Sequence, residues 1–317
     1  MKNIKKVELH VHLDGSVRPT TISELLSINL EEAISKSSIL NKANSLKEYL
    51  EKFTIPLKIM QTKESLARIS QELAEDLIKD NVIYAEIRFA PNKHLEQGLN
   101  LDEVILSVLK GLSKEPIKTN LILCMMRGDT YEKNLQIIKL AKKYIGKGVV
   151  GIDLAGNEAA YPVTDYQKLF EIAKRKNIPF TIHAGEADGA ISVINAIDLG
   201  TKRIGHGVRS IESKTALKLI KEKGITLEVC PKSNLDTNIY SNLKEHPIKK
   251  LFDEGIKVTL NTDNRTVSNI TLNETYSELE KTFHFSKEDF LIMNKNAIES
   301  AFISKEEKQE LLNLLLK

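Results

Sequence analysis

The chain has 317 residues, of which 41% are hydrophobic and 28% are charged. This composition excludes a disordered or fibrous protein, because enough apolar side chains are present to bury a full-sized core. The 46 basic and 43 acidic residues leave a net charge of +3. No basic tract stands out, so we expect neither nucleic acid nor an anionic membrane as a partner.

The cellular compartment is constrained by what the sequence lacks. The N-terminal stretch has no apolar signal segment, and no apolar run approaches the ~18 residues that a membrane span needs. The two cysteines, Cys124 and Cys230, are too few for a disulfide framework. We therefore expect a cytoplasmic protein. As a separate expectation, the protein is a monomer or a weak homo-oligomer.

Short β-rich segments alternate with amphipathic stretches of helical periodicity, such as 130–145 and 211–223. Strands are expected at 5–13, 82–90, 119–127, 149–155, 179–185, 203–208, 226–231 and 257–263. Alternation of this kind predicts parallel strands joined by right-handed crossovers. Eight units predict an α/β fold, a (β/α)₈ barrel that takes up residues 1–317 as a single domain and carries its chemistry at the carboxyl ends of the strands.

The first connection is too long for one helix, because residues 14–81 separate the first two predicted strands. A helical insertion is therefore expected at about 20–80. Within it, segment 45–60 places Leu46, Tyr49, Leu50 and Phe53 on one face of a helix. This apolar stripe is explained either by ordinary core packing or by a lid over the barrel mouth.

Histidines and a carboxylate occur where predicted strands end. His10 and His12 are two residues apart on the first strand, so both rings point into the barrel. His183, His206 and Asp263 end the fifth, sixth and eighth strands. Their position at one rim predicts a metal site. Three histidines and one carboxylate suit Zn²⁺ with an open position, although iron, manganese or cobalt could also bind.

A metal of this kind lowers the pKa of bound water, which makes the expected protein a hydrolase. Glu186 follows His183 by three residues and can face the same cavity as a proton carrier. The alternative for Glu186 is an acid at the start of the next helix. A redox or nucleophilic role for Cys230 is the weaker reading of that residue, because a buried thiol without a basic partner is inert.

Several segments together resemble the adenosine deaminase family. They are VELHVHLDGSVRP (7–19), GIDLAGNE (151–158), HAGE (183–186), RIGHG (203–207), CPKSN (230–234) and NTDN (261–264). They occur in family order and at family spacing over residues 7 to about 276. The resemblance implies a mononuclear zinc barrel hydrolase of purine salvage that converts adenosine, together with 2′-deoxyadenosine, to inosine and ammonia.

The resemblance also implies residue roles. Glu186 protonates purine N1, His206 acts as a base or an electrostatic guide, and the backbone N–H of Gly156 meets N3. His12 and Asp263 would contact the reacting groups as well as the metal. The metal ligands implied are His10, His12, His183 and Asp263.

Contacts with the substrate are implied at six further positions. Asp14 is similar to a partner of the ribose 5′-hydroxyl, which favours a nucleoside over the free base and repels a 5′-phosphate. Asn264 would donate to purine N7. The positions that line the family's entrance with apolar side chains are Leu46, Tyr49, Leu50 and Phe53.

Two positions depart from the family pattern. The family commonly has Asp where this chain has Asn264, and Asp where it has Asn157. The amide of Asn264 can always donate, whereas a carboxyl donates only when protonated, so we expect activity to survive. Two alternatives to an adenosine deaminase are left open. One is a deaminase that acts on adenine, an N6-substituted AMP or aminodeoxyfutalosine, and the other is a non-catalytic protein that binds nucleosides.

Overall fold

The structure is a computed structural model that describes residues 3–40, 42–43 and 46–317. Within these residues it has eight β-strands, one for each strand predicted from the sequence. They are β1 (Lys6–His12), β2 (Val82–Phe89), β3 (Lys118–Met126), β4 (Val149–Ala155), β5 (Thr181–Ala184), β6 (Arg203–His206), β7 (Thr226–Val229) and β8 (Lys257–Leu260). The last four are shorter than predicted. β5, for example, lies between Pro179, which has no N–H to donate, and Gly185, whose φ of 69° turns the chain.

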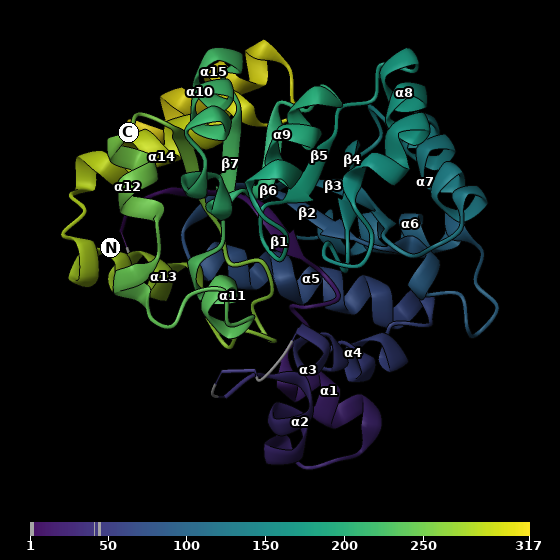
Figure 1. The fold of residues 1–317 in the computed structure, drawn as a ribbon. Coiled ribbons are helices and arrows are strands. Elements are labelled where there is room, and N and C mark those ends of the chain that lie inside the picture. Colours follow the sequence, from purple (N-terminus) through teal and green to yellow (C-terminus); the bar gives the residue numbers. More distant parts are fainter. Residues whose placement is uncertain (1–2, 41, 44–45) are drawn as a thin grey trace.

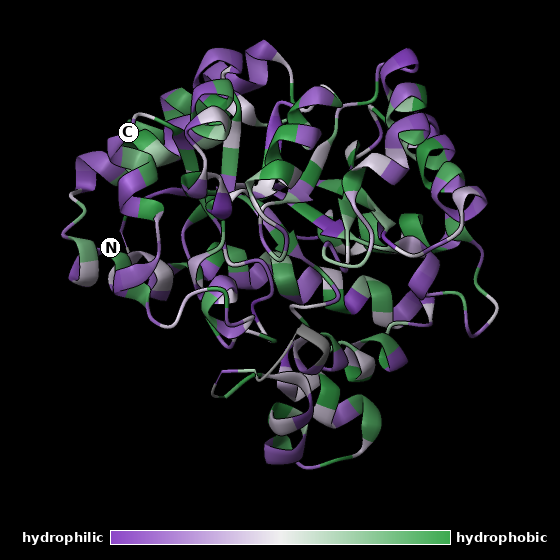
Figure 2. Ribbon diagram, viewed as in Figure 1, coloured by the Kyte–Doolittle hydropathy of each residue, from purple (hydrophilic) through white to green (hydrophobic). Residues whose placement is uncertain are grey.

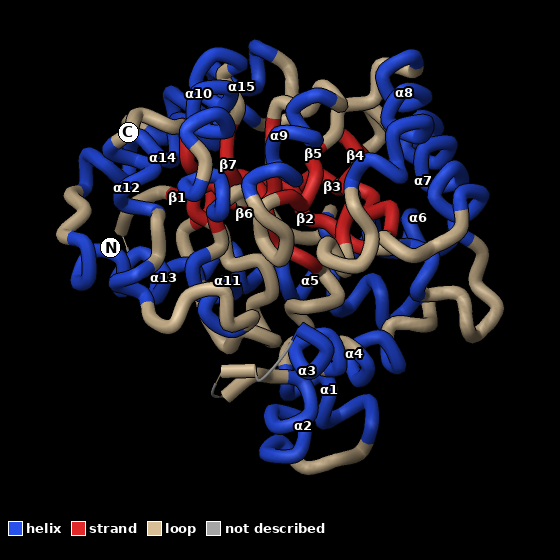
Figure 3. Tube along the Cα trace, in the orientation of Figure 1, coloured by secondary structure: helices blue, strands red, loops and turns tan. Residues whose placement is uncertain are grey.

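The strands form one closed barrel, and Figure 3 shows them grouped at the centre of the molecule. Parallel pairing runs from β1 to β4 and from β5 to β8. Two isolated bridges join these halves. Val11 pairs with Asp263, where the His12 N–H donates to the Asp263 carbonyl at 2.7 Å, and Ile152 pairs with Phe180. The predicted (β/α)₈ barrel is thereby confirmed.

Helices surround the barrel (Figure 1). In chain order they are α1 (Pro19–Leu26), α2 (Leu30–Ser37), α3 (Leu46–Glu51), α4 (Thr54–Ile59), α5 (Lys63–Lys79), α6 (Leu101–Leu112), α7 (Tyr131–Tyr144), α8 (Gln167–Arg175), α9 (Ala190–Asp198), α10 (Lys214–Lys223), α11 (Pro231–Asp236), α12 (Ile248–Asp253), α13 (Leu272–Phe283), α14 (Lys287–Ser300) and α15 (Lys305–Leu315). Short 3₁₀ helices occur at η1 (Pro91–Lys93), η2 (Val163–Tyr166), η3 (Val208–Glu212) and η4 (Leu243–Glu245). The helix expected at 211–223 begins later, at Lys214, because the Ser213 side chain caps it by accepting from the Ala216 N–H.

The helical insertion lies between β1 and β2, as the long first connection predicts. Helices α1–α4 gather beyond the ring of barrel helices, at the bottom of Figure 1. The stripe expected on one helix is divided, because residues 46–59 form two short helices, α3 and α4, and Phe53 lies between them. A continuous helix would need an N–H at residue 56 to reach the carbonyl of Lys52, and Pro56 has none.

Hydrophobic packing follows the layers of the barrel. Val11, Ile87, Leu123 and Ile152 on the strands are completely buried, as expected when helices cover a parallel sheet. Figure 2 shows hydrophilic and hydrophobic residues alternating along the outer helices, which therefore have one face on this core. In the described part of the chain, no helix combines the length and the apolar character that crossing a membrane requires.

Candidate active site

Four side chains gather at the carboxyl ends of the strands. His10 and His12 lie on β1, His183 lies on β5, and Asp263 follows β8. Asp263 Oδ1 is 3.3 Å from the Nε2 atoms of both His10 and His12, and the Nε2 atoms of His12 and His183 are 3.3 Å apart. The ligand atoms of all four residues lie within 4.8 Å of one another. The barrel thus brings together the four residues that the sequence nominates as metal ligands.

The ring orientations suit a divalent cation. His10 Nδ1 is 2.9 Å from Glu228 Oε2, and His183 Nδ1 is 2.9 Å from Asp153 Oδ2. A ring whose Nδ1 hydrogen faces a carboxylate keeps its lone pair on Nε2, which is how imidazole binds metals. The buried Nε2 of His10 has no hydrogen-bond partner among the described residues. These donors therefore fit a metal ion.

The charge states of the donors fit as well. Burial lowers the pKa of His12 well below its ordinary value, so this ring is neutral. Burial alone disfavours the carboxylate of Asp263, but contact with His10 and the nearby charge of His12 hold the pKa of Asp263 well below its ordinary value. Ser233 Oγ also donates to Asp263 Oδ2 at 2.6 Å. The cluster therefore offers a neutral imidazole at His12 and an ionised carboxylate at Asp263.

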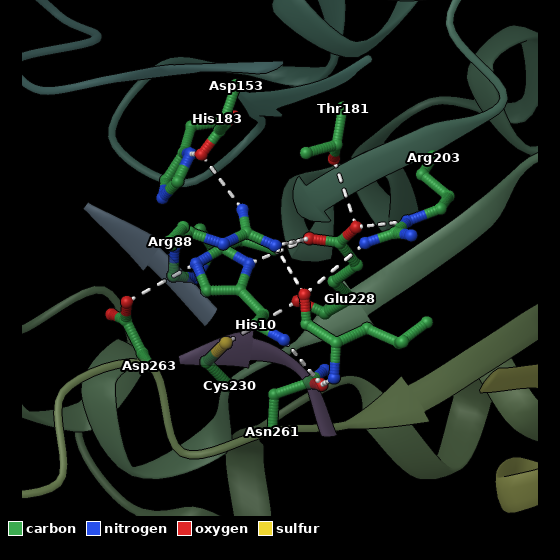
Figure 4. Close-up of polar contacts among 12 residues, drawn as sticks. His10, Arg88, Asp153, Thr181, His183, Arg203, Glu228, Cys230, Asn261 and Asp263 are labelled. Carbon is green, nitrogen blue, oxygen red and sulfur yellow. Dashed lines mark hydrogen bonds and ion pairs between the residues drawn. The ribbon is translucent and has the colours of Figure 1, made fainter. Parts of the chain in front are cut away.

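A buried ionic network supports the ligands from beneath (Figure 4). Arg88 lies between two acids, with Nη1 2.9 Å from Asp153 Oδ2 and Nη2 2.7 Å from Glu228 Oε2. Arg203 Nε reaches the other oxygen of Glu228 at 2.6 Å. No motif in the sequence predicts a role for these residues. A signal was present, because Arg88, Asp153 and Glu228 are charged residues within otherwise apolar strands.

The backbone is strained at two of the predicted site residues. His206 and Asp263 both have φ of 62°, in the left-handed region that side chains other than glycine rarely adopt. Such a conformation costs on the order of 1–3 kcal/mol and persists where the surrounding structure holds it. At both positions the left-handed backbone conformation changes the direction of the side chain at the end of the strand.

Glu186 faces His206 across the site. His206 Nε2 is 3.5 Å from Glu186 Oε2. Burial raises the pKa of Glu186 well above its ordinary value, and the negative charges of Asp263 and Glu158 raise it further. Burial at this site therefore favours the protonated form of Glu186. It lies outside the first turn of α9, which begins at Ala190, so it does not serve as an acid at that helix start.

Glu158 fixes the loop that carries Glu186. Its two carboxylate oxygens accept hydrogen bonds from four successive backbone N–H groups, those of residues 185–188, at 2.6–3.1 Å, and from the Ser192 hydroxyl. Successive N–H groups of this kind form a concavity for an anion. On the far side of the turn, Arg127 Nη2 donates to the His183 carbonyl at 2.6 Å. Glu158 ends the GIDLAGNE segment (151–158), but the sequence pattern predicts no role for it.

We expect Glu158→Gln to destabilise the protein by about 3 kcal/mol, because an amide has one acceptor oxygen and turns an NH₂ group towards buried N–H donors. Denaturant-induced unfolding of both proteins measures the difference. Ser192→Ala is the matched control, since it removes one donor to the same carboxylate and should cost about 1 kcal/mol. Equal stability of Glu158→Gln and the unmodified protein would contradict the supporting role.

A cavity of about 300 Å³ lies beside the cluster and is large enough for a small ligand. Its wall includes most of the residues singled out from the sequence: His12, Asp14, Tyr49, Leu50, Phe53, Gly156, His183, Glu186, His206, Asp263 and Asn264. The side chain of Leu46 lies outside the part that the structure describes. Burial raises the pKa of Asp14 to about 6.

The phenol of Tyr49 on helix α3 makes polar contacts in the site. Tyr49 is 3% exposed, whereas Leu50 beside it is 40% exposed. The Asn264 Nδ2 donates to the Tyr49 hydroxyl at 2.9 Å, and the hydroxyls of Ser233 and Ser268 each lie 3.3 Å from it. The insertion is therefore anchored to the cavity wall by a polar contact as well as by apolar packing.

Two other sequence features have structural explanations. Asn157 Oδ1 accepts the Ala160 N–H at 3.2 Å and so closes a turn. Cys230 is buried, and burial raises the pKa of its thiol well above the ordinary value. A thiol held in this form is a poor nucleophile, which argues against chemistry at Cys230.

Fold and site together define a barrel hydrolase whose centre is suited to a metal ion. A family model described as "Adenosine deaminase" matches residues 5–317. The chain is 44% identical to an adenosine deaminase of Clostridium acetobutylicum, covering 99% of this chain and 97% of the relative. The chain belongs to the adenosine deaminase family, whose members are metal-dependent.

Solved structures agree on the fold. An adenine deaminase from Arthrobacter aurescens superposes with a TM-score of 0.90 at 24% identity, covering 99% of this chain and 98% of that one. An Arabidopsis N6-mAMP deaminase has a TM-score of 0.89 at 27% identity, with the same coverage of 99% and 98%. The same barrel thus carries enzymes named for different aminopurines.

Proposed function

We propose that this protein catalyses the hydrolytic deamination of adenosine, and of 2′-deoxyadenosine, to inosine and ammonia. The observation that carries the proposal is the cavity in which a protonated acid, Glu186, faces a buried group of three histidines and Asp263. That arrangement supplies both a proton donor and a site for a metal, in a chain of the adenosine deaminase family.

In this proposal the metal is zinc. Nitrogen from three imidazoles and one carboxylate oxygen are ligand types that zinc prefers. A zinc ion lowers the pKa of bound water to about 7, which makes hydroxide available at neutral pH. The residues that would hold the ion are His10, His12, His183 and Asp263.

The remaining residues act on the base. Glu186 gives its proton to purine N1, which makes C6 more electrophilic, and its raised pKa keeps that proton available. His206 lies next to Glu186 at the reacting end of the cavity. Gly156 lines the wall, where its N–H would meet purine N3.

Asp14 supports a nucleoside as the substrate. It lines the cavity and is 7% exposed, so a hydrogen bond to a ribose hydroxyl would be made away from water. A site built to bind a hydroxyl can reject an analogue without it by about 10⁴-fold. Adenine lacks the ribose, and an N6-substituted AMP would bring a phosphate close to this carboxyl.

The proposal is tested by ammonia release from adenosine, 2′-deoxyadenosine, adenine, N6-methyl-AMP and aminodeoxyfutalosine. We expect kcat/KM for the two nucleosides to exceed that for adenine by about 10³-fold or more. Preference for any of the other three compounds would replace adenosine as the substrate. Nucleoside binding without ammonia release from any of them would favour the non-catalytic alternative.

Asn264→Asp tests the departure at the N7 position. We expect kcat/KM to fall about tenfold at neutral pH, because an ionised carboxyl cannot donate to N7 and is repelled by its lone pair. The loss should shrink as the pH is lowered and the carboxyl gains a proton. Asn157→Asp is the matched control and should stay within about threefold. A tenfold gain in Asn264→Asp would show that the amide is a defect.

A cytoplasmic location fits this proposal, because Cys124 and Cys230 are both buried and free. We further propose that the enzyme is a monomer or a weak homo-oligomer.

A further inference from the structure

A chain of hydrogen bonds runs from His206 to the backbone near α12. His206 Nδ1 lies 3.1 Å from Asn234 Nδ2, and Asn234 Oδ1 lies 3.2 Å from His246 Nε2. The backbone N–H of Ile248 donates to His246 Nδ1 at 3.2 Å. Each of the three side chains is at most 2% exposed, so water does not compete for these contacts.

The backbone N–H at the end of this series of hydrogen bonds determines which atom is the donor in each of the others. The Ile248 N–H can only donate, so His246 Nδ1 accepts and the single hydrogen of the neutral His246 ring sits on Nε2. Burial lowers the pKa of His246 to about 3, so the ring stays neutral. Its Nε2–H donates to Asn234 Oδ1, which turns the Asn234 NH₂ towards His206.

We propose that Asn234 and His246 are positioning residues that make His206 Nδ1 a hydrogen-bond acceptor and so place the hydrogen of the neutral His206 ring on Nε2, facing the cavity. The opposite tautomer would set an Nδ1–H against the Asn234 NH₂. Exchanging the positions of the amide oxygen and nitrogen of Asn234 would not remove this donor–donor contact. The Asn234 NH₂ would then face the Nε2–H of His246. Either arrangement leaves buried donors without acceptors.

The consequence for chemistry is that His206 donates into the cavity. A ring with its hydrogen on Nε2 cannot take a proton there, so in the resting protein His206 is a hydrogen-bond donor and not a base. Its Nε2 points towards Glu186 Oε2 at 3.5 Å, beside the reacting end of the cavity. The catalytic part of this inference rests on the proposed function, whereas the position of the hydrogen does not.

The position of the hydrogen can be measured without turnover. Nitrogen-15 NMR of histidine-labelled, metal-loaded protein distinguishes a protonated ring nitrogen from an acceptor nitrogen, and loss of the signals in His206→Gln assigns them. We expect the hydrogen on Nε2 of His206. A hydrogen on Nδ1 in the unmodified protein would overturn the proposal.

Asn234→Asp reverses the contact without changing its size. A carboxylate accepts from both histidines, so the His206 hydrogen should move to Nδ1. We expect kcat for adenosine to fall about 10²-fold, the effect of losing one aligned donor, while the affinity for inosine changes less than about threefold. If the His206 tautomer stays unchanged in this variant, the proposal that Asn234 sets that tautomer is contradicted.

His246 gives a second test in case the new charge prevents folding. In His246→Gln the amide can still donate to Asn234 Oδ1, so kcat should remain within about fivefold. In His246→Leu nothing orients Asn234, and we expect mixed His206 tautomers and a kcat reduced about tenfold. If His246→Leu has the same His206 tautomer and the same kcat as the unmodified protein, the proposal is contradicted. If the unmodified protein has the hydrogen on Nε2 of His206 but does not deaminate adenosine, the proposed substrate is wrong, whereas the proposed role of Asn234 and His246 is still supported.

Discussion

Glu186→Gln is expected to lower kcat for adenosine by about 10³-fold, within the range that a positioned proton donor contributes. The amide has the shape of the acid but no proton to give to N1. The loss should appear in kcat with little change in the affinity for inosine, because ground-state contacts are kept. The ultraviolet change on deamination measures the rate.

The matched control is Glu212→Gln. Glu212 is a half-exposed acid paired with Arg209 at 2.8 Å on the neighbouring surface. Its replacement should leave kcat within about twofold, as surface changes usually do. If Glu186→Gln keeps most of the rate, Glu186 is not the proton donor.

The same acid predicts how the rate depends on pH. Burial raises the pKa of Glu186 well above its ordinary value, so the group is protonated at neutral pH and loses its proton as the pH rises. For the unmodified enzyme, kcat/KM should therefore fall on the alkaline side, at the raised pKa. The residual rate of Glu186→Gln should lack this alkaline decline. The same alkaline limb in both proteins would assign it to another group.

Removal of the metal is expected to abolish activity, a loss of at least about 10³-fold, and addition of Zn²⁺ should restore it. Zinc should also raise the unfolding temperature of the metal-free protein, because a ligand at 1,000 times its Kd stabilises the folded state by about 4.1 kcal/mol. Magnesium should do neither, since it prefers oxygen ligands. Activity and thermal unfolding are followed on the same samples.

His183→Ala is the control for the metal test. Its unfolding temperature should respond to zinc much less than that of the unmodified protein, because one of the grouped donors is gone. Full activity of the protein after chelation, with metal content verified as absent, would contradict the metal-dependent proposal.

Local patterns in the sequence were enough to predict the framework of the molecule. Each of the eight strands lies in a short β-rich segment, and amphipathic stretches of helical period separate most of these segments. His10 and His12 are two residues apart on one strand, so their common direction follows from the period of a strand. Segments such as HAGE and NTDN then placed His183, Glu186 and Asp263 at strand ends, where parallel strands meet at one rim.

Other features depend on residues far apart in the chain. Pairings such as Glu228 with Arg203 and His10, or Tyr49 with Asn264, join residues with no pattern linking them. Even a feature visible locally was incomplete, because the stripe through Tyr49 and Phe53 indicated one helix and Pro56 divides it into two.

The sequence by itself therefore determined the barrel, the long first connection and the identity of the side chains at its rim, since each follows from short-range spacing. Only the tertiary structure decided how those side chains are held. Glu158 accepts four backbone N–H groups of the loop bearing Glu186, and the Ile248 N–H orients His246, Asn234 and His206 in turn. Hydrogen bonds of this kind depend on distance and direction in space, which no spacing along the chain encodes.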